Sequence, residues 1–171
     1  MMRKRIAIGF VIAGILAAAG VSSRAENKDD PAALAKALSE ASVSLEQGLK
    51  ASEREGRPIS GKYEMEYGGL QLSVYTTKGD KFFEVVIDHK SGTVKKAETI
   101  TDAEDLRDAK EQRQAMAKAK IPLNRAVETT ITANGGYRAV SIMPMLTSGK
   151  PVAAITLMKG QEVKKVTAKL D

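Results

Sequence analysis

The chain has 171 residues, with 27 Lys and Arg against 21 Asp and Glu, and it contains neither cysteine nor tryptophan. Four of the basic residues lie in the segment 1–25, and the others are interleaved with acidic residues, which argues against nucleic-acid binding. The absence of cysteine excludes disulfide bonds and thiolate metal ligands, and it argues against a lipid attached to an N-terminal cysteine.

The N-terminal segment 1–25 has the three parts of a secretory signal peptide. Basic residues at positions 3–5 precede an uncharged apolar stretch from Ile6 to Val21, and Ser23-Arg24-Ala25 places small residues at a cleavage site. A helix over this stretch would span only about 24 Å, short of the roughly 30 Å hydrocarbon core, so an uncleaved anchor is the less favoured alternative. We expect cleavage after Ala25 and a periplasmic or secreted protein, which would touch the membrane only through an uncleaved signal.

Apolar residues at helical spacing predict a helix from Pro31 to Gly56. Asp30 is suited to cap its first turn, and Pro31 is suited to the first helical position. Ser44 and Gln47 have the spacing of a capping box, which predicts that the helix restarts at Ser44.

The apolar period then changes to two, which predicts an antiparallel meander. A strand over 62–67 is followed by a two-residue turn at Gly68-Gly69, which is typical of a hairpin. A return strand follows, and then a turn at 78–80. The strand over 81–88 is apolar on both faces and is expected to be central. A last strand is predicted over 93–98.

The segment 101–120 is strongly charged and begins with Thr101 and Glu104 at capping-box spacing. It is interpreted as a solvated connecting helix, with a partner-binding spacer as the alternative. Pro122 disfavours helical geometry at the residue before it, so a new helix is predicted over 122–133. Strands are then predicted over 137–146, 151–158 and 162–168.

Two parts of the chain are similar to each other. The start of the helix at Val43–Leu49 matches Ile121–Val127, and Lys81 matches Lys150 at a smaller offset along the chain. The smaller offset is most simply explained by an extra hairpin at Gly68-Gly69 in the first repeat. The predicted fold class is α+β, with two helix-plus-antiparallel-sheet repeats, neither of which buries its apolar face well alone.

The segment from Phe82 to Val94 resembles the signature of PepSY domains, which runs from an aromatic-Glu-Val strand through an acidic residue to a Gly turn. The helix starting near Val43 is similar to the family's helix, and residues 121–171 resemble the same module more loosely. The resemblance implies a PepSY-like repeat over 26–100, a connecting helix over 101–120 and a second repeat over 121–171. It also implies a binding module outside the cytoplasm that inhibits or chaperones secreted peptidases, and it implies no catalytic residues.

No catalytic residue and no cofactor are predicted. His89 is the only histidine, and with no cysteine present it supports neither a catalytic triad nor a zinc site. Met143 and Met145 are weak candidates for copper(I) ligands, with Met158, Met65 and His89 as additional ligands if the fold brought them together. The alternative is that these methionines fill core space.

The candidate binding surface consists of Tyr63, Met65 and Tyr67, which share one side of the first strand. Tyrosine supplies a large contact area at low entropic cost, which suits recognition of a protein partner. The alternative is that the three side chains form the inner face of the sheet beneath the helix over 44–55. The predicted function is a non-catalytic protein-interaction module that modulates secreted peptidases; the alternatives are a periplasmic copper-binding protein and an envelope stress or signalling accessory protein.

Overall fold

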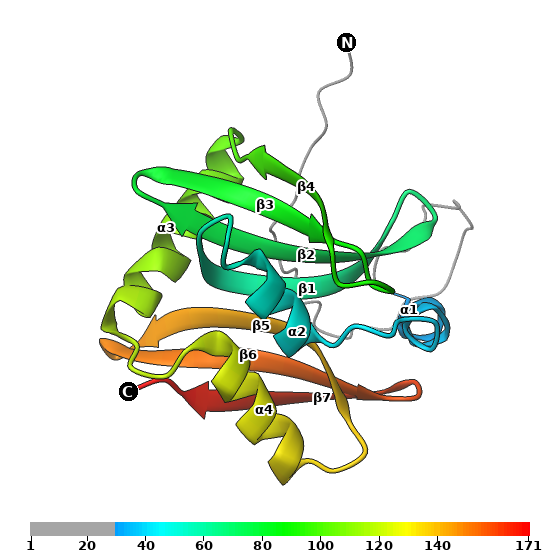
Figure 1. Ribbon diagram of the computed structural model, residues 1–171. Coiled ribbons are helices and arrows are strands. Elements are labelled where there is room, and N and C mark those ends of the chain that lie inside the picture. The colour runs from blue at the N-terminus through cyan, green and yellow to red at the C-terminus, as the bar shows by residue number, and fades with distance from the viewer. Residues whose placement is uncertain (1–29) are drawn as a thin grey trace, which may run out of the picture.

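The computed structural model describes residues 30–171, so the predicted signal peptide and its cleavage site after Ala25 lie outside the described residues. Over the described range the fold is α+β, as expected, with four helices and one seven-stranded antiparallel sheet of strand order β4-β3-β2-β1-β5-β6-β7 (Figure 1). The two predicted repeats therefore build one continuous sheet. None of the described helices is both long and apolar enough to cross a membrane.

The elements follow one another in the order helix-helix-strands, twice. The first set is α1 (Pro31–Leu38), α2 (Leu45–Ser52), β1 (Arg57–Glu66), β2 (Gly69–Lys78), β3 (Lys81–Ile87) and β4 (Val94–Thr99). The second set is α3 (Ala103–Lys118), α4 (Leu123–Ala133), β5 (Arg138–Thr147), β6 (Lys150–Lys159) and β7 (Glu162–Lys169).

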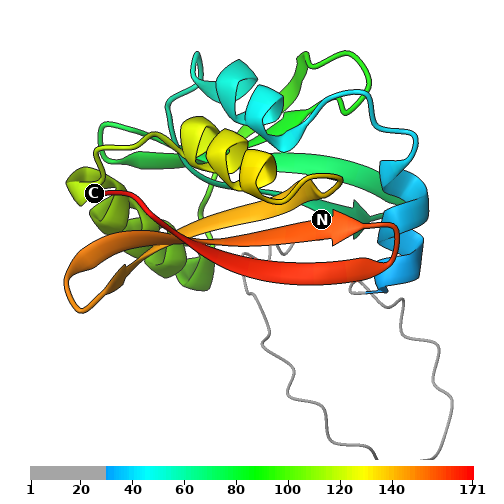
Figure 2. The same ribbon diagram turned by 90° about the horizontal axis from the view of Figure 1, so that it is seen from below.

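Helices α2 and α4 pack side by side on one face of the sheet (Figures 1 and 2). Glycine on β1 favours close approach on this face, because a Cβ on Gly61 would lie 3.3 Å from the side chains of both Leu45 and Leu49. The opposite face is contacted by α3, where the Ser60 hydroxyl donates to Gln112 over 2.7 Å. Figure 2 shows α1 against the end of the sheet that lies away from α3.

The capping box at Ser44 and Gln47 is confirmed, since each residue's side chain accepts from the other's backbone N–H. It starts a separate helix, α2, because α1 ends at Leu38 and the backbone N–H groups of Ser42 and Val43 donate to the carbonyl oxygen of His89. The predicted cap at Thr101 is wrong by one residue: Asp102 caps α3.

The strands of the two halves correspond through one constant offset, the one that relates Arg57 to Arg138. The bulge between Pro58 and Ser60 on β1 recurs between Ala139 and Ser141 on β5. The strands β1, β2 and β3 start at equivalent positions to β5, β6 and β7, respectively. Gly61 pairs with Ile142, its own counterpart, so the halves are related by an approximate two-fold axis through this pair.

The predicted match of Lys81 to Lys150 is therefore wrong, because Lys81 corresponds to Glu162 at the start of β7. The additional element of the first half is β4, at the edge of the sheet, and not a hairpin at Gly68-Gly69. The turn itself consists of Tyr67-Gly68, both with positive φ, whereas Gly69 begins β2. A glycine turn follows nearly every strand of this chain, so one turn is easily mistaken for the next. The predicted match paired the start of β6 with the start of β3, although β6 corresponds to β2.

The predicted match between the two helices is confirmed by the starts of α2 at Leu45 and α4 at Leu123. The same offset relates Leu38 at the end of α1 to Met116 near the end of α3, and both side chains are buried. Helix α3 is thus the second half's counterpart of α1, and the predicted connecting segment 101–120 belongs to the second half.

Two arginines at equivalent positions each form hydrogen bonds to the other half. Arg138 begins β5, and its guanidinium donates to the carbonyl oxygens of Leu38 (2.9 Å) and Ala41 (3.1 Å) at the end of α1. Arg57 begins β1, and its guanidinium donates over 2.7 Å to the carbonyl oxygen of Met116 in α3. Each half therefore holds the first helix of the other.

Candidate functional site

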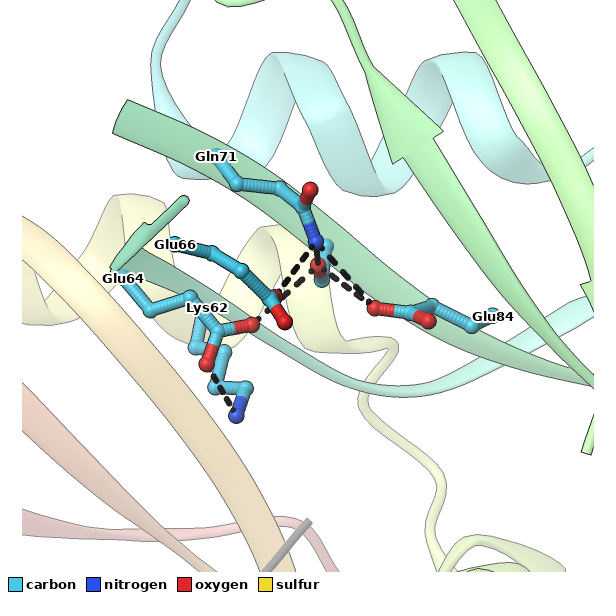
Figure 3. Close-up of polar contacts among 6 residues, drawn as sticks. Lys62, Glu64, Glu66, Gln71 and Glu84 are labelled. Atoms are coloured by element: carbon cyan, nitrogen blue, oxygen red, sulfur yellow. Dashed lines mark hydrogen bonds and ion pairs between the residues drawn. The ribbon is translucent and has the colours of Figure 1, made fainter. Parts of the chain in front are cut away.

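Six polar side chains form a cluster on the face of β1, β2 and β3 opposite to α2 and α4 (Figure 3). We call Lys62, Glu64, Glu66, Gln71, Ser73 and Glu84 the carboxylate cluster. The alternation of β1 places its Lys and Glu residues on this face, while Gly61 and Tyr63 face the helices. Glu84 and Ser73 are buried at 7% and 0% exposure, whereas the other members are partly exposed.

Ser73 lies at the centre of the cluster. Its hydroxyl oxygen is 2.9 Å from Glu84 Oε1 and 3.4 Å from Glu64 Oε1, and it accepts from Gln71 Nε2 over 2.9 Å. The same Gln71 nitrogen lies 3.2 Å from Glu66 Oε2. Lys62 Nζ forms an ion pair with Glu64 over 2.7 Å. Three carboxylates thus share one ammonium group and two neutral donor side chains.

Burial and charge raise the pKa of Glu84 above its ordinary value. Desolvation is the largest cause, and the negative charges of Glu64 and Glu66 act in the same direction. The hydrogen bond from Ser73 and the charge of Lys62 oppose the increase. The neighbouring Tyr75 is buried as well, and its pKa is raised well above its ordinary value, first by desolvation and then by Glu84. The protonated form of Glu84 is therefore favoured by its surroundings.

The second half carries no equivalent of this cluster. At the offset that relates the strands of the two halves, Lys62 and Glu64 correspond to Met143 and Met145, and the buried Ser73 corresponds to Ala154. These three backbone positions therefore accept apolar side chains. The fold itself does not require carboxylates at these positions, which makes the cluster a property of the first half alone.

The tip of the β1–β2 hairpin carries the most exposed of the large hydrophobic side chains in the described part of the chain. Tyr67 is 79% exposed, and its φ is +49°. The equivalent turn between β5 and β6 has Ser148 at φ +50°, followed by Gly149. A left-handed conformation is unfavourable for a bulky side chain, and asparagine or glycine usually occupies it in such turns. Tyr67 is thus costly for the turn and is not buried by the fold.

The surface predicted from Tyr63, Met65 and Tyr67 is not formed. Tyr63 is only 4% exposed, its hydroxyl donates to the carbonyl oxygen of Val43, and the guanidinium of Arg138 lies 5.2 Å from its ring centre. Met65 is half-buried on the same face. Tyr63 belongs to the core because α2 covers this face of β1, so Tyr67 is the fully accessible member of the three.

The predicted copper ligands are not brought together. Met143 and Met145 share one face of β5, with Met143 half-buried and Met145 38% exposed. Met65 lies on the other face of the sheet. His89 follows β3, which is three strands from β5, or roughly 14 Å. Residues 30–171 contain no group of three or more His, Asp or Glu side chains placed to hold a metal ion.

The acidic residue of the resemblance, Asp88, has a role in the turn after β3. One of its carboxylate oxygens accepts from the backbone N–H groups of Lys90 and Ser91, each over 2.8 Å, and the other pairs with Lys95 over 2.9 Å. The backbone bond from Ser91 is the largest cause that lowers the pKa of Asp88 far below its ordinary value, followed by Lys95 and Lys90. Asp88 therefore stabilises the turn in its ionised form.

A pocket of about 380 Å³ lies where the two halves meet, between the end of α2 and the segment that joins α3 to α4. Its wall combines the apolar side chains of Leu49 and Leu123 with the basic side chains of Arg57 and Lys120. Glu53 also lines the pocket, so its charge is mixed. None of the residues of the carboxylate cluster line it.

The carboxylate cluster was not predicted from the sequence. The signal for it was Glu84, a carboxylate within the otherwise apolar segment Phe82–Ile87, where a charged side chain is expensive to bury. Glu64 and Glu66 alternate with apolar residues, which is typical of a solvated strand face. Alternation shows which residues share a face, but it does not show that β1 and β3 bring their carboxylates to one place beside Gln71 and Ser73 of β2.

Comparison with known proteins leaves the chain without an assigned family. No protein-family model and no curated protein matches it. A solved structure described as a "putative lipoprotein" from Clostridium difficile 630 matches with a TM-score of 0.41 and 14% identity, over 71% of this chain and 80% of the other.

Proposed function

We propose that the chain is an exported, non-catalytic protein-interaction module that inhibits or chaperones a secreted peptidase and contacts its partner through the tip of the β1–β2 hairpin. The expectation of export comes from the N-terminal segment, and that of a peptidase partner comes from the PepSY resemblance. The observation that carries the proposal is the conformation and exposure of Tyr67.

A tyrosine at position 67 is unfavourable for two reasons. Its left-handed backbone costs roughly 1–2 kcal/mol relative to glycine, and its ring is left in water. Ser148 occupies the equivalent position of the second half with a small side chain. The turn does not need this exposed aromatic side chain. Tyrosine is enriched at the few interface residues that contribute most of the binding energy, so Tyr67 is suited to contact a protein partner.

The surroundings of Tyr67 indicate the chemistry of the partner. Glu64 and Glu66 come directly before the tip on β1, and both belong to the carboxylate cluster. The partner surface is therefore expected to combine an apolar pocket for the ring with basic side chains around it.

Replacing Tyr67 by asparagine should separate binding from stability. We expect Tyr67→Asn to leave the free energy of unfolding unchanged or to raise it by up to about 1 kcal/mol, because asparagine accepts the left-handed conformation. Recovery of the crosslinked partner from cells should fall at least about tenfold, the effect of losing roughly 1.4 kcal/mol of binding energy. Urea unfolding and quantitative mass spectrometry of crosslinked protein measure the two quantities.

Ser148→Asn is the matched control, because it introduces the same residue at the equivalent position of the other turn and should leave partner recovery unchanged. A peptidase among the partners would support inhibition or chaperoning, and an envelope sensor would favour the signalling alternative. Equal recovery with Tyr67→Asn, or copurification of a small molecule or metal with no protein partner, would contradict the proposal.

A further inference from the structure

The three carboxylates of the carboxylate cluster share two neutral donor side chains, and Lys62 forms an ion pair with Glu64. The Ser73 hydroxyl has one proton, which only one of Glu64 and Glu84 can accept at a time. Gln71 Nε2 has two protons for three acceptors, at Ser73 (2.9 Å), Glu66 (3.2 Å) and Glu84 (3.4 Å). A proton on one carboxyl group would supply a further donor and remove one of the like charges.

Glu84 is the member on which that proton would act most strongly. It is the most buried of the three glutamates, and its strand, β3, lies between two others. The strands on both sides present titratable or charged groups to this face. They are Lys62, Glu64 and Glu66 on β1, Tyr75 directly opposite on β2, and Glu98 directly opposite with Lys96 on β4. From α3, the buried Asp105 acts on Tyr75.

We propose that the carboxylate cluster is a proton-responsive element: uptake of a proton at Glu84 completes its hydrogen bonding and holds β1, β2 and β3 together more tightly in weakly acidic solution than at neutral pH. The cluster lies at the base of the hairpin that carries Tyr67, so it would adjust the rigidity of that hairpin. The proton-responsive element rests on the geometry of the cluster and does not require the proposed function.

The direction of the pH dependence follows from the charge state. The pKa of Glu84 is raised above its ordinary value of 4.5. Its contribution to stability is therefore fully present below that value and is lost as the pH rises through the higher pKa in the folded protein. Asp88 has the opposite sign, because its lowered pKa gives a contribution that is lost only as the pH falls below its ordinary value of 3.8. The two effects occupy separate pH ranges.

The variant Glu84→Gln tests the inference, because glutamine keeps an acceptor for Ser73 and supplies a permanent neutral donor. We expect the urea midpoint of the mature protein to decrease as the pH rises from 5 to 8, with a change in the unfolding equilibrium constant of at most about tenfold for each unit by which burial raises the pKa. Glu84→Gln should remove this Glu84-dependent change and should be at least as stable as the parent at pH 8.

Glu98→Gln is the matched control. Glu98 lies opposite Glu84 on β4, but its side chain is 42% exposed and pairs with Lys96 over 2.5 Å. This variant should keep the pH dependence of the parent.

Carboxyl ¹³C NMR titration of the parent protein decides the question even if a variant fails to fold. The Glu84 signal is expected to titrate above the ordinary value of 4.5. Titration of Glu84 at or below its ordinary pKa, or an unchanged pH dependence in a folded Glu84→Gln, would overturn the inference.

Discussion

Removal of the Arg138 side chain is expected to lower the free energy of unfolding by about 3–5 kcal/mol. Its guanidinium donates to the carbonyl oxygens of Leu38, Ala41 and Val43 and to the hydroxyl of Tyr63 over 3.2 Å. Hydrogen bonds to a charged group contribute about 1.5–3 kcal/mol each, and removing the donor leaves partly buried acceptors without partners. The loss would be a large part of a total stability of about 5–15 kcal/mol.

Urea unfolding of Arg138→Ala measures the loss, and hydrogen exchange over residues 31–43 shows where it occurs, because α1 and the segment before α2 should become labile first. Arg57→Ala is the matched control from the other half. Arg57 is exposed and donates to the carbonyl oxygen of Met116, so we expect a loss of about 1 kcal/mol. A loss below that value for Arg138→Ala would show that Arg138 does not hold α1.

Separating the two halves is expected to abolish cooperative folding of each. In a chain limited to residues 28–100, β1 loses its pairing with β5, and α2 loses its packing against α4. The buried side chains of Leu45 and Leu49 would lie beside the exposed edge. Each fully buried side chain of this size contributes roughly 1.5–3 kcal/mol, so exposing a few of them removes most of the stability.

Circular dichroism melting of residues 28–100 and of residues 101–171, compared with residues 26–171, checks this expectation. The boundary at residue 100 follows the structure, in which α3 belongs to the second half. An equimolar mixture of the two fragments should recover part of the cooperative transition, because β1 and β5 can pair across chains. If residues 28–100 alone melt cooperatively at the temperature of the whole, the halves are independent modules.

Elements with strong local signals were predicted closely. The last three strands, expected at 137–146, 151–158 and 162–168, are Arg138–Thr147, Lys150–Lys159 and Glu162–Lys169. Glycine turns and alternation define such strands from the chain alone. The capping box at Ser44 likewise located the start of α2 to the residue.

Relations between distant segments were not predictable in the same way. The match between the strands of the two halves depended on which glycine turn was paired with which, and local chemistry does not distinguish neighbouring turns. Period-two alternation placed Tyr63 with Tyr67, but Tyr63 is buried against the segment that leads into α2, whereas Tyr67 lies in the turn at positive φ. The contact of Arg138 with Leu38 joins segments far apart in the sequence, and no spacing indicates it.

Site-specific photocrosslinking tests the central claim most directly. A photoreactive phenylalanine derivative would replace Tyr67 in one protein and Ser148 in another, and both would be expressed in cells and irradiated. The proposed function predicts a discrete crosslinked protein from position 67, identified by mass spectrometry, and none from position 148. Equal crosslinking at both positions, or no protein crosslink at position 67 when the mature protein is present, would contradict recognition through the β1–β2 hairpin.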